Sequence, residues 1–276
     1  MIQTKLHSLY GLKWNPFSGE LPIEALIKTP KINHFAWKIE NLVLDGGFAL
    51  ITGDSGLGKS TTCRLLHDKF NQINEIKAVE FSRPQSGLTD FYRELGLIFG
   101  IDLRSSNKYG GFQKLREKWS EHIKKTLLRP ILFLDEAQEA PTSILSELRL
   151  LGSTRFDSKI ILTVVLCGDK RMLRKLDSED LHPLENRIRT RLIFERYSRE
   201  ESIDLLHEAL ERAGNPTLMT KGLIETLADS SMGNPRTMMS IAQVLLLKAA
   251  EKELKQISED LYIEMFSNEL PKKKKK

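Results

Sequence analysis

The feature that most constrains the fold of this chain is a short apolar run that ends in a glycine-rich turn. The apolar run covers residues 48–52, and a helical pattern follows the turn over residues 60–70. The turn itself reads Gly53-Asp54-Ser55-Gly56-Leu57-Gly58-Lys59-Ser60. A buried strand, a turn with three glycines and a helix, in that order, predict a strand–turn–helix unit of the kind found beside parallel sheets.

The turn has the spacing G-x-x-x-x-G-K-[ST] of a phosphate-binding loop. Glycines let the backbone wrap around phosphates, so that successive N–H groups and the helix N-terminus face the negative charge. We expect Lys59 to reach the β and γ phosphates and the Ser60 hydroxyl to bind Mg²⁺. The predicted nucleotide-binding residues of this segment are Gly53, Asp54, Ser55, Gly56, Leu57, Gly58, Lys59, Ser60 and Thr61. A chance glycine-rich turn is the alternative, and the matching strand and helix argue against it.

A second motif supports the first. The apolar run 130–134 is followed by Asp135 and Glu136, and ligands of open α/β sheets bind where strands end. We predict that Asp135 holds Mg²⁺ and that Glu136 is the general base that polarises a water for attack on the γ phosphate. Two adjacent acids therefore favour hydrolysis over transfer to a hydroxyl. The alternative is an acidic pair favoured by a helix N-terminus.

Short apolar runs alternate with helical patterns through the first two thirds of the chain. The predicted strands are 48–52, Ile76–Phe81, 130–134, 160–167 and a weaker 191–195. The predicted helices between them are 60–70, Leu88–Phe99, 112–127 and 142–151. This alternation predicts an α/β fold with a parallel five-stranded sheet flanked by helices.

After Tyr197 the pattern is helical only. Ser198 and Glu201 form a capping box before the helix Arg199–Ala213, and Ser258 is expected to cap a last helix. Two further helices are predicted over Lys221–Ser230 and Pro235–Glu251. The expected domains are therefore an α/β domain with an N-terminal arm (1–196), a small helical lid domain (197–270) and a lysine tail (271–276).

Composition excludes several classes of protein. The apolar runs are much shorter than the roughly 20 residues that cross a bilayer, and residues 1–10 lack the apolar segment of a secretory signal. We therefore expect no membrane partner. Cys63 and Cys167 are distant in the sequence and neither demand nor exclude a disulfide, so a reducing cytoplasm is the default expectation. Lys and Arg number 42 against 37 Asp and Glu, but five of the lysines form the terminal run 272–276. The rest of the chain is neutral, so net charge alone does not predict nucleic-acid binding.

Taken together, these motifs resemble those of an AAA+ ATPase over nearly the whole chain. The segments Leu9-Tyr10-Gly11-Leu12 and Asn15-Pro16-Phe17 are similar to the opening of the ExeA-like family, in which this segment packs beside the adenine. An ordinary hydrophobic arm is the alternative for these residues. The resemblance implies a P-loop AAA+ domain that converts ATP and water to ADP and phosphate, with ATP and Mg²⁺ as ligands.

The resemblance also implies roles for residues outside the two motifs. Asp169 occupies the position of sensor 1, where family members often carry Asn, Thr or Gln, and the alternative role for this residue is a helix cap. Arg187-Ile188-Arg189 resembles the segment of the arginine finger, which enters the nucleotide site of a neighbouring subunit. Arg187 is the first choice for the finger, with Arg189 and Arg191 as alternatives.

Gly233-Asn234-Pro235-Arg236 resembles sensor 2. An arginine at a helix start is electrostatically unfavourable unless an anion meets it. We therefore expect Arg236 to contact the γ phosphate.

A subgroup of soluble relatives, the TnsC, TniB and IstB-like proteins, assembles on DNA and presents target sites to a transposase. The stretch from Phe81 through Tyr109 resembles the channel-facing segment of TnsC, and it predicts DNA-backbone contacts by Arg83, Arg104 and Lys108. An exposed polar loop is the alternative for each of them. No base-reading motif is visible, so binding of double-stranded DNA should be sequence-tolerant.

The function expected from this resemblance is an ATP-dependent regulator of DNA transposition. It would form rings or helical filaments with itself on duplex DNA, and would meet a transposase and a target-selection protein. Two alternatives stay open. One is an ExeA-type secretion-assembly ATPase, and the other is an ATP-binding switch with little turnover.

Overall fold

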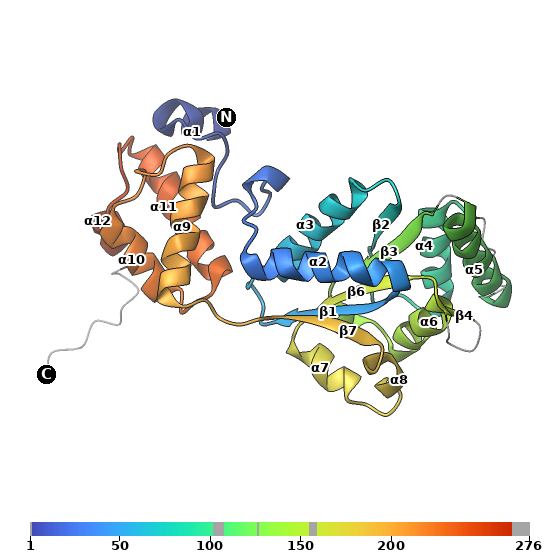
Figure 1. Ribbon diagram of the computed structural model, residues 1–276. Coiled ribbons are helices and arrows are strands. Elements are labelled where there is room, and N and C mark those ends of the chain that lie inside the picture. Colours follow the sequence, from blue (N-terminus) through green and yellow to red (C-terminus); the bar gives the residue numbers. More distant parts are fainter. Residues whose placement is uncertain (1, 102–107, 126, 155–158, 267–276) are drawn as a thin grey trace, which may run out of the picture. The chain divides into compact units, whose positions relative to one another are not determined.

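The computed structural model describes residues 2–101, 108–125, 127–154 and 159–266 (Figure 1). These residues form two compact units. One unit is Lys28–Phe194, and the other combines Met1–Ile27 with Glu195–Lys276. Each unit is described separately below.

A five-stranded parallel sheet forms the centre of the unit 28–194. Its strands are β1 (Gly47–Gly53), β2 (Ile76–Phe81), β3 (Arg129–Leu134), β6 (Thr163–Gly168) and β7 (Ile188–Phe194). Their order is β2-β3-β6-β1-β7, and neighbouring strands pair in parallel throughout this sheet. This arrangement confirms the predicted α/β architecture.

Helices cover both faces of the sheet (Figure 1). On one face, Leu50, Leu132 and Val164 belong to a core shared with α4 (Leu88–Phe99), α5 (Lys108–Lys125), α6 (Thr142–Gly152), α7 (Lys170–Leu176) and α8 (His182–Glu185). On the other face lie α2 (Pro30–Asp45) and α3 (Lys59–Asn71). Because side chains alternate between the faces of a strand, a sheet covered on both sides needs the continuous apolar runs seen in the sequence.

Helix α2 was not among the predicted elements, although its start carries a clear signal. Thr29 caps the helix by accepting a hydrogen bond from Ile32 N (3.3 Å), and Pro30 is its first residue. A capping threonine followed by proline is a common helix start. Its buried apolar residues pack on the same face of the sheet as the predicted helix α3.

The predicted strand 160–167 is divided in the structure. Ile160 belongs to β5 (Lys159–Ile160), which pairs with β4 (Ser153–Thr154) in a separate antiparallel ladder. Ile161 N then donates to Gly152 O (2.7 Å), so the chain joins the main sheet only at Thr163. An apolar run alone does not show where pairing changes partner. In the same way, β7 begins three residues before the predicted fifth strand.

The second unit is helical. Its elements are α1 (Ile2–Tyr10), η1 (Ile23–Ala25), α9 (Arg199–Ala213), α10 (Lys221–Ser230), α11 (Pro235–Glu251) and α12 (Glu259–Phe266). Ser198 and Glu201 form both bonds of the expected capping box at the start of α9. Across residues 2–101, 108–125, 127–154 and 159–266, none of the helices combines the length and the apolar character that a membrane span requires.

The first 27 residues group with these helices, whereas the sequence assigned them to the α/β domain. Leu6, Tyr10 and Phe17 are buried in the same core as the apolar residues of α9 to α12. Lys13 N donates to Ala213 O (2.9 Å), and the Asn215 side chain donates to the backbone oxygen of Tyr10 (2.9 Å). An amphipathic arm carries no sequence signal for which core it joins, and for this reason the pattern could not decide its domain.

The turn at Gly233 provides a test of the packing in the helical unit. Gly233 has φ +72°, and a Cβ placed there would lie 2.3 Å from Tyr197 O. Gly11 of the same unit has φ +68° but open space around the Cβ position. We expect Gly11→Ala to lower the free energy of unfolding by about 1 kcal/mol, from backbone strain alone. Gly233→Ala should cost at least about 3 kcal/mol, because it adds a backbone clash to that strain. Thermal unfolding of both variants measures the difference, and equal losses would contradict this packing.

Candidate nucleotide-binding and hydrolytic site

The glycine-rich turn lies between β1 and α3, at the carboxyl end of the sheet. Gly56 and Gly58 have φ +86° and +99°, a conformation that side-chain-bearing residues rarely adopt. Successive N–H groups in such a turn form a concave anion-binding surface, and α3 begins directly behind it. The local geometry is therefore that of a phosphate cradle.

Lys59 is the first residue of α3, and its side chain is buried with only 8% of its surface exposed. Its Nζ donates to the backbone oxygen of Asp54 (3.0 Å), which holds the ammonium across the loop. The next residue, Ser60, is exposed, and Thr61 is half-buried. A cation held over the loop and an accessible hydroxyl beside it are the groups that a bound triphosphate requires.

Asp54 of the loop is also tied to the end of strand β6. The Lys170 ammonium forms an ion pair with the Asp54 carboxylate (2.9 Å). Lys170 is the first residue of α7, directly after β6. Sequence reasoning did not single out Lys170, because the pairing of β1 with β6 is what brings it to the loop.

Asp135 and Glu136 follow β3, which is separated from β1 by the single strand β6. Asp135 is half-buried, and its Oδ1 accepts a hydrogen bond from Glu136 N (2.9 Å). Glu136 is exposed and has φ +50°, in the left-handed region. A non-glycine residue pays a conformational cost there, and such strain is concentrated at functional positions.

Cys167, near the end of β6, lies beside Asp135. Its thiol is hydrogen-bonded to Cys63 of α3 and to Asp135. The hydrogen bond to Cys63 and then burial raise the pKa of the Cys167 thiol, so it stays protonated. Both cysteines are free and buried.

The residues present fit ATP and Mg²⁺. Ser60 and Asp135 offer a hydroxyl and a carboxylate oxygen, which are the hard ligands that Mg²⁺ prefers. Mg²⁺ usually takes one or two protein oxygens and completes its shell with phosphates and water. The glycine cradle and the buried Lys59 supply the complementary binding surface for those phosphates.

Asp169 caps a helix in this structure. Its Oδ1 accepts from Arg171 N (2.8 Å) at the start of α7, and its Oδ2 accepts from Arg171 Nε (2.8 Å). This geometry is the helix-cap role that the sequence left open. Contact of Asp169 with nucleotide stays a prediction.

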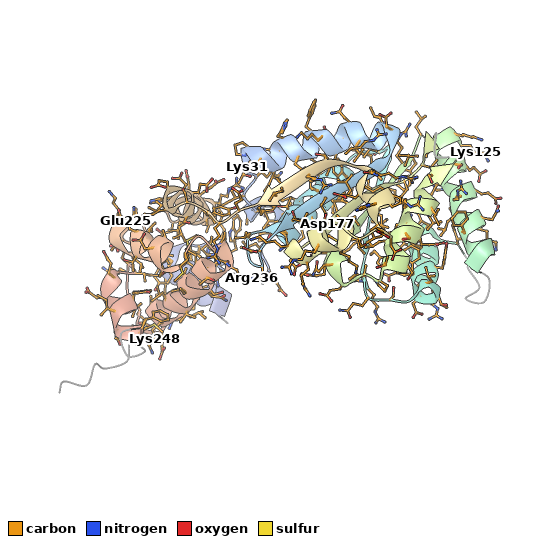
Figure 2. The ribbon with its side chains drawn as sticks, turned by 90° about the horizontal axis from the view of Figure 1, so that it is seen from below. Lys31, Lys125, Asp177, Glu225, Arg236 and Lys248 are labelled. Carbon is orange, nitrogen blue, oxygen red and sulfur yellow. The ribbon has the colours of Figure 1, made fainter. Side chains whose placement is uncertain are left out.

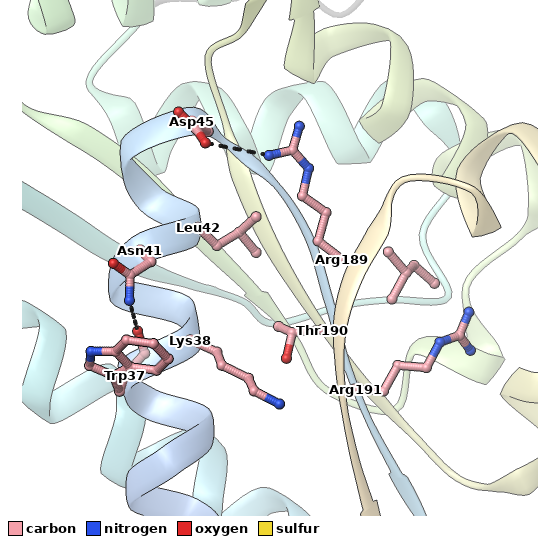
Figure 3. Close-up of a pocket in the computed structure, with 9 residues that line it drawn as sticks. Trp37, Lys38, Asn41, Leu42, Asp45, Arg189, Thr190 and Arg191 are labelled. Atoms are coloured by element: carbon pink, nitrogen blue, oxygen red, sulfur yellow. Dashed lines mark hydrogen bonds and ion pairs between the residues drawn. The ribbon is translucent and has the colours of Figure 1, made fainter.

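The three candidate finger arginines lie around the start of β7. Arg187 donates to Arg149 O (3.1 Å), and Arg191 forms an ion pair with Glu185 (3.3 Å). Arg189 reaches Asp45 (3.6 Å) across a groove of about 610 Å³ between α2 and β7 (Figure 3). All three therefore have bonds within their own chain. The choice among them stays a prediction.

Arg236 belongs to the helical unit and is exposed at the start of α11 (Figure 2). Asn234 caps this helix by accepting from Arg236 N (3.0 Å) and Thr237 N (3.4 Å). The Gly-Asn-Pro-Arg sequence thus forms the expected turn and helix start. A contact of Arg236 with a γ phosphate stays a prediction.

The predicted DNA contacts are only partly described. Arg83 is exposed in the turn after β2, and its backbone oxygen accepts from Ser86 N (3.1 Å). Lys108 begins α5, but its side chain lies outside the described part of the chain, as does the whole of Arg104. The lysine tail 271–276 is also outside it. These roles stay predictions.

Part of the chain matches a known family of domains. Residues 43–176 match the model of the AAA domain family. The chain is 29% identical over 209 residues to general secretion pathway protein A of Aeromonas hydrophila, covering 74% of this chain and 37% of that protein. The chain therefore spans well under half the length of this relative.

Solved structures share the fold at low identity. The ORC2 protein of Aeropyrum pernix, in its ADPNP–ADP complexes, aligns with a TM-score of 0.71 and 16% identity, over 92% of this chain and 71% of that one. The ORC1 protein of the same organism, in complex with DNA, gives 0.65 and 17%, over 92% and 67%. The fold is the P-loop AAA+ fold. Together with the AAA domain match, it is consistent with ATP hydrolysis.

The cradle makes a direct prediction for Lys59. Lys59→Ala removes the ammonium that faces the phosphates, and we expect ATP binding to fall below detection in titration calorimetry. The matched control is Lys69→Ala in the last turn of the same helix, where the lysine pairs with Glu40 (2.6 Å) on the surface. That variant should bind ATP as the unaltered protein does. Unchanged ATP affinity in Lys59→Ala would remove this assignment.

Proposed function

We propose that this chain is a Mg²⁺-dependent ATPase whose nucleotide state controls its assembly on duplex DNA. The observation that carries the ATPase part is the position of Asp135 and Glu136 at the end of β3, at the same sheet edge as the loop 53–60. A phosphate cradle without a neighbouring acid would support binding alone. The exposed Glu136 carboxylate beside it supplies a base for hydrolysis.

The residues divide the work as follows. The backbone N–H groups of residues 54–60 and the Lys59 ammonium bind the triphosphate, and Ser60 and Asp135 hold Mg²⁺. Bound Mg²⁺ neutralises charge on the phosphates. A Glu136 carboxylate oxygen accepts the proton of the attacking water, which leaves ADP and phosphate as products. Because Glu136 does not serve as the metal ligand, binding and chemistry depend on different side chains.

Two arginines from outside the α/β unit that binds the nucleotide are proposed to complete the site. We infer that Arg187 of one subunit approaches the γ phosphate bound by its neighbour, with Arg189 and Arg191 as alternatives, and that Arg236 of the helical lid approaches it from the same chain. Cations that stabilise the transition-state charge in this way make hydrolysis depend on assembly. The expected assembly is a ring or helical filament.

We further propose that the assembled protein regulates DNA transposition in the cytoplasm. Arg83 is exposed, and with Arg104 and Lys108 it would contact the phosphate backbone without reading sequence. The fold similarity to an ORC1 protein solved with DNA supports a DNA partner. A transposase and a target-selection protein would then recognise the assembly.

An ExeA-type secretion-assembly ATPase is the second candidate. The observation that favours it is the 29% identity to general secretion pathway protein A over 209 residues. Both candidates share the hydrolytic site and differ in the partner. Electron microscopy with a non-hydrolysable ATP analogue separates them, since the transposition regulator should form ordered oligomers that require duplex DNA. Assembly that ignores DNA would favour the secretion reading.

Glu136→Gln should separate binding from chemistry. The change keeps the shape and removes the base, so ATP binding should survive while hydrolysis slows by on the order of 10²-fold or more. If ATP hydrolysis triggers disassembly, Glu136→Gln should form long-lived oligomers on DNA. Asp135→Asn should bind ATP and assemble poorly in addition to hydrolysing slowly. The measurement is oligomer lifetime on DNA after dilution into nucleotide-free buffer. Glu136→Gln oligomers that dissociate as fast as the unaltered ones would favour the ATP-binding switch with little turnover.

Arg187→Ala tests the site in trans. It should bind ATP normally and lose hydrolysis by up to about 10³-fold, because the transition-state charge is left uncompensated. Mixing it with Lys59→Ala protein should restore some activity, since an intact Arg187 can then meet an intact nucleotide site. Steady-state phosphate release across mixing ratios measures the rescue. An absence of rescue in mixed oligomers would point to Arg189 or Arg191, or to a site without a finger.

A further inference from the structure

The side chain of Gln138 joins the two strand ends on which the proposed hydrolysis depends. Gln138 lies on the short turn η2 (Ala137–Glu139), two residues after Glu136, and only 7% of its surface is exposed. Its Nε2 donates to Oε2 of Glu136. Its Oε1 accepts from the backbone N–H of Asp169 (3.1 Å), directly after β6. One amide thus links the general base to the neighbouring strand.

The neighbours of this amide fix its orientation. A backbone N–H can only donate, and an ionised carboxylate can only accept. Turning the amide by 180° would place two donors together at Asp169 and two acceptors together at Glu136. The oriented amide therefore restrains the Glu136 carboxylate from one side, while the exposed remainder of Glu136 stays available for water.

The turn that carries Gln138 is itself held in place. Lys175 of α7 donates from Nζ to the backbone oxygens of Gln138 (3.0 Å) and Ala140. Arg171 forms an ion pair with Glu139 (2.7 Å). Side chains of α7 thus fix the backbone on both sides of Gln138, so its amide does not have to be ordered at the moment of reaction.

Gly168 makes room for this arrangement. A Cβ at Gly168 would lie 2.6 Å from Oε1 of Gln138 and 3.2 Å from Cβ of Met172. Its backbone φ is not in the left-handed region, so close approach, rather than conformation, requires a glycine here. The absence of a side chain at the last residue of β6 therefore leaves the space that the Gln138 amide occupies.

From these contacts we propose that Gln138 is a positioning residue for hydrolysis, which holds Glu136 in its working orientation and ties it to the end of β6. This inference rests on the proposed function, since it assigns a role at the same hydrolytic site. Gln138 acts through Glu136 and has no proposed contact with nucleotide. Its loss should therefore lower kcat and leave nucleotide binding intact.

The test compares single and double variants at Gln138 and Gly168 with one control, in single-turnover ATP hydrolysis and in titration with an ATP analogue. Gln138→Glu keeps an acceptor for the Asp169 N–H but sets a carboxylate against Glu136. Gly168→Ala displaces the amide without changing its chemistry. Each should lower kcat by roughly 10- to 100-fold, the cost of a misplaced catalytic group, with analogue Kd unchanged within about twofold. Gln72→Ala is the control: it removes an exposed amide that donates to Asp68 at the end of α3, and it should keep the unaltered kcat.

Gln138→Ala supplies the second half of the test. It should reduce kcat as Gln138→Glu does, and adding Gly168→Ala to it should cause no further loss, because the amide that Gly168 accommodates is gone. Additive losses, or losses of kcat, analogue affinity and melting temperature together, would show a structural role and overturn the inference. Full kcat in Gln138→Glu, beside a loss in Glu136→Gln, would overturn it and leave the proposed function standing. Full kcat in Glu136→Gln would instead contradict the proposed function itself.

Discussion

The parallel pairing of β1, β6 and β3 is the constraint on which the candidate site depends. Thr52 is in register with Gly168, and Leu134 with Leu166, so the three strands finish at nearly the same level. Parallel strands deliver their carboxyl ends to one edge, and the segments that follow them meet there. Three stretches of chain that are distant in sequence thereby become neighbours.

Two polar side chains connect the segments that follow these strands at this edge. Lys170 connects the end of β6 to Asp54 of the phosphate loop, and Gln138 connects it to Glu136 after β3. The segment after β6 therefore contacts both the proposed binding element and the proposed base.

The sequence was sufficient for the parts of the site that are local. The glycine spacing in residues 53–60 and the acids after residues 130–134 each determine their own backbone context, so the loop, the strand and the sheet edge followed from pattern alone. The bridges of Lys170 and Gln138 could not be predicted, because they depend on strand order and register. The N-terminal 27 residues show the same limit, since their apolar pattern is satisfied by either core. The sequence left Asp169 open as a sensor or as a cap, and the hydrogen bond from Arg171 N shows the cap, while its contact with nucleotide stays a prediction.

The central claim is that the loop 53–60 binds MgATP and that β3 brings Glu136 to its terminal phosphate. A crystal structure with Mg²⁺ and a non-hydrolysable ATP analogue measures this most directly. We predict phosphates against the backbone of residues 54–60, the metal among the oxygens of Ser60 and Asp135, and a water between Glu136 and the γ phosphate. An analogue bound elsewhere, or a Glu136 carboxylate directed away from the γ phosphate in that complex, would contradict it.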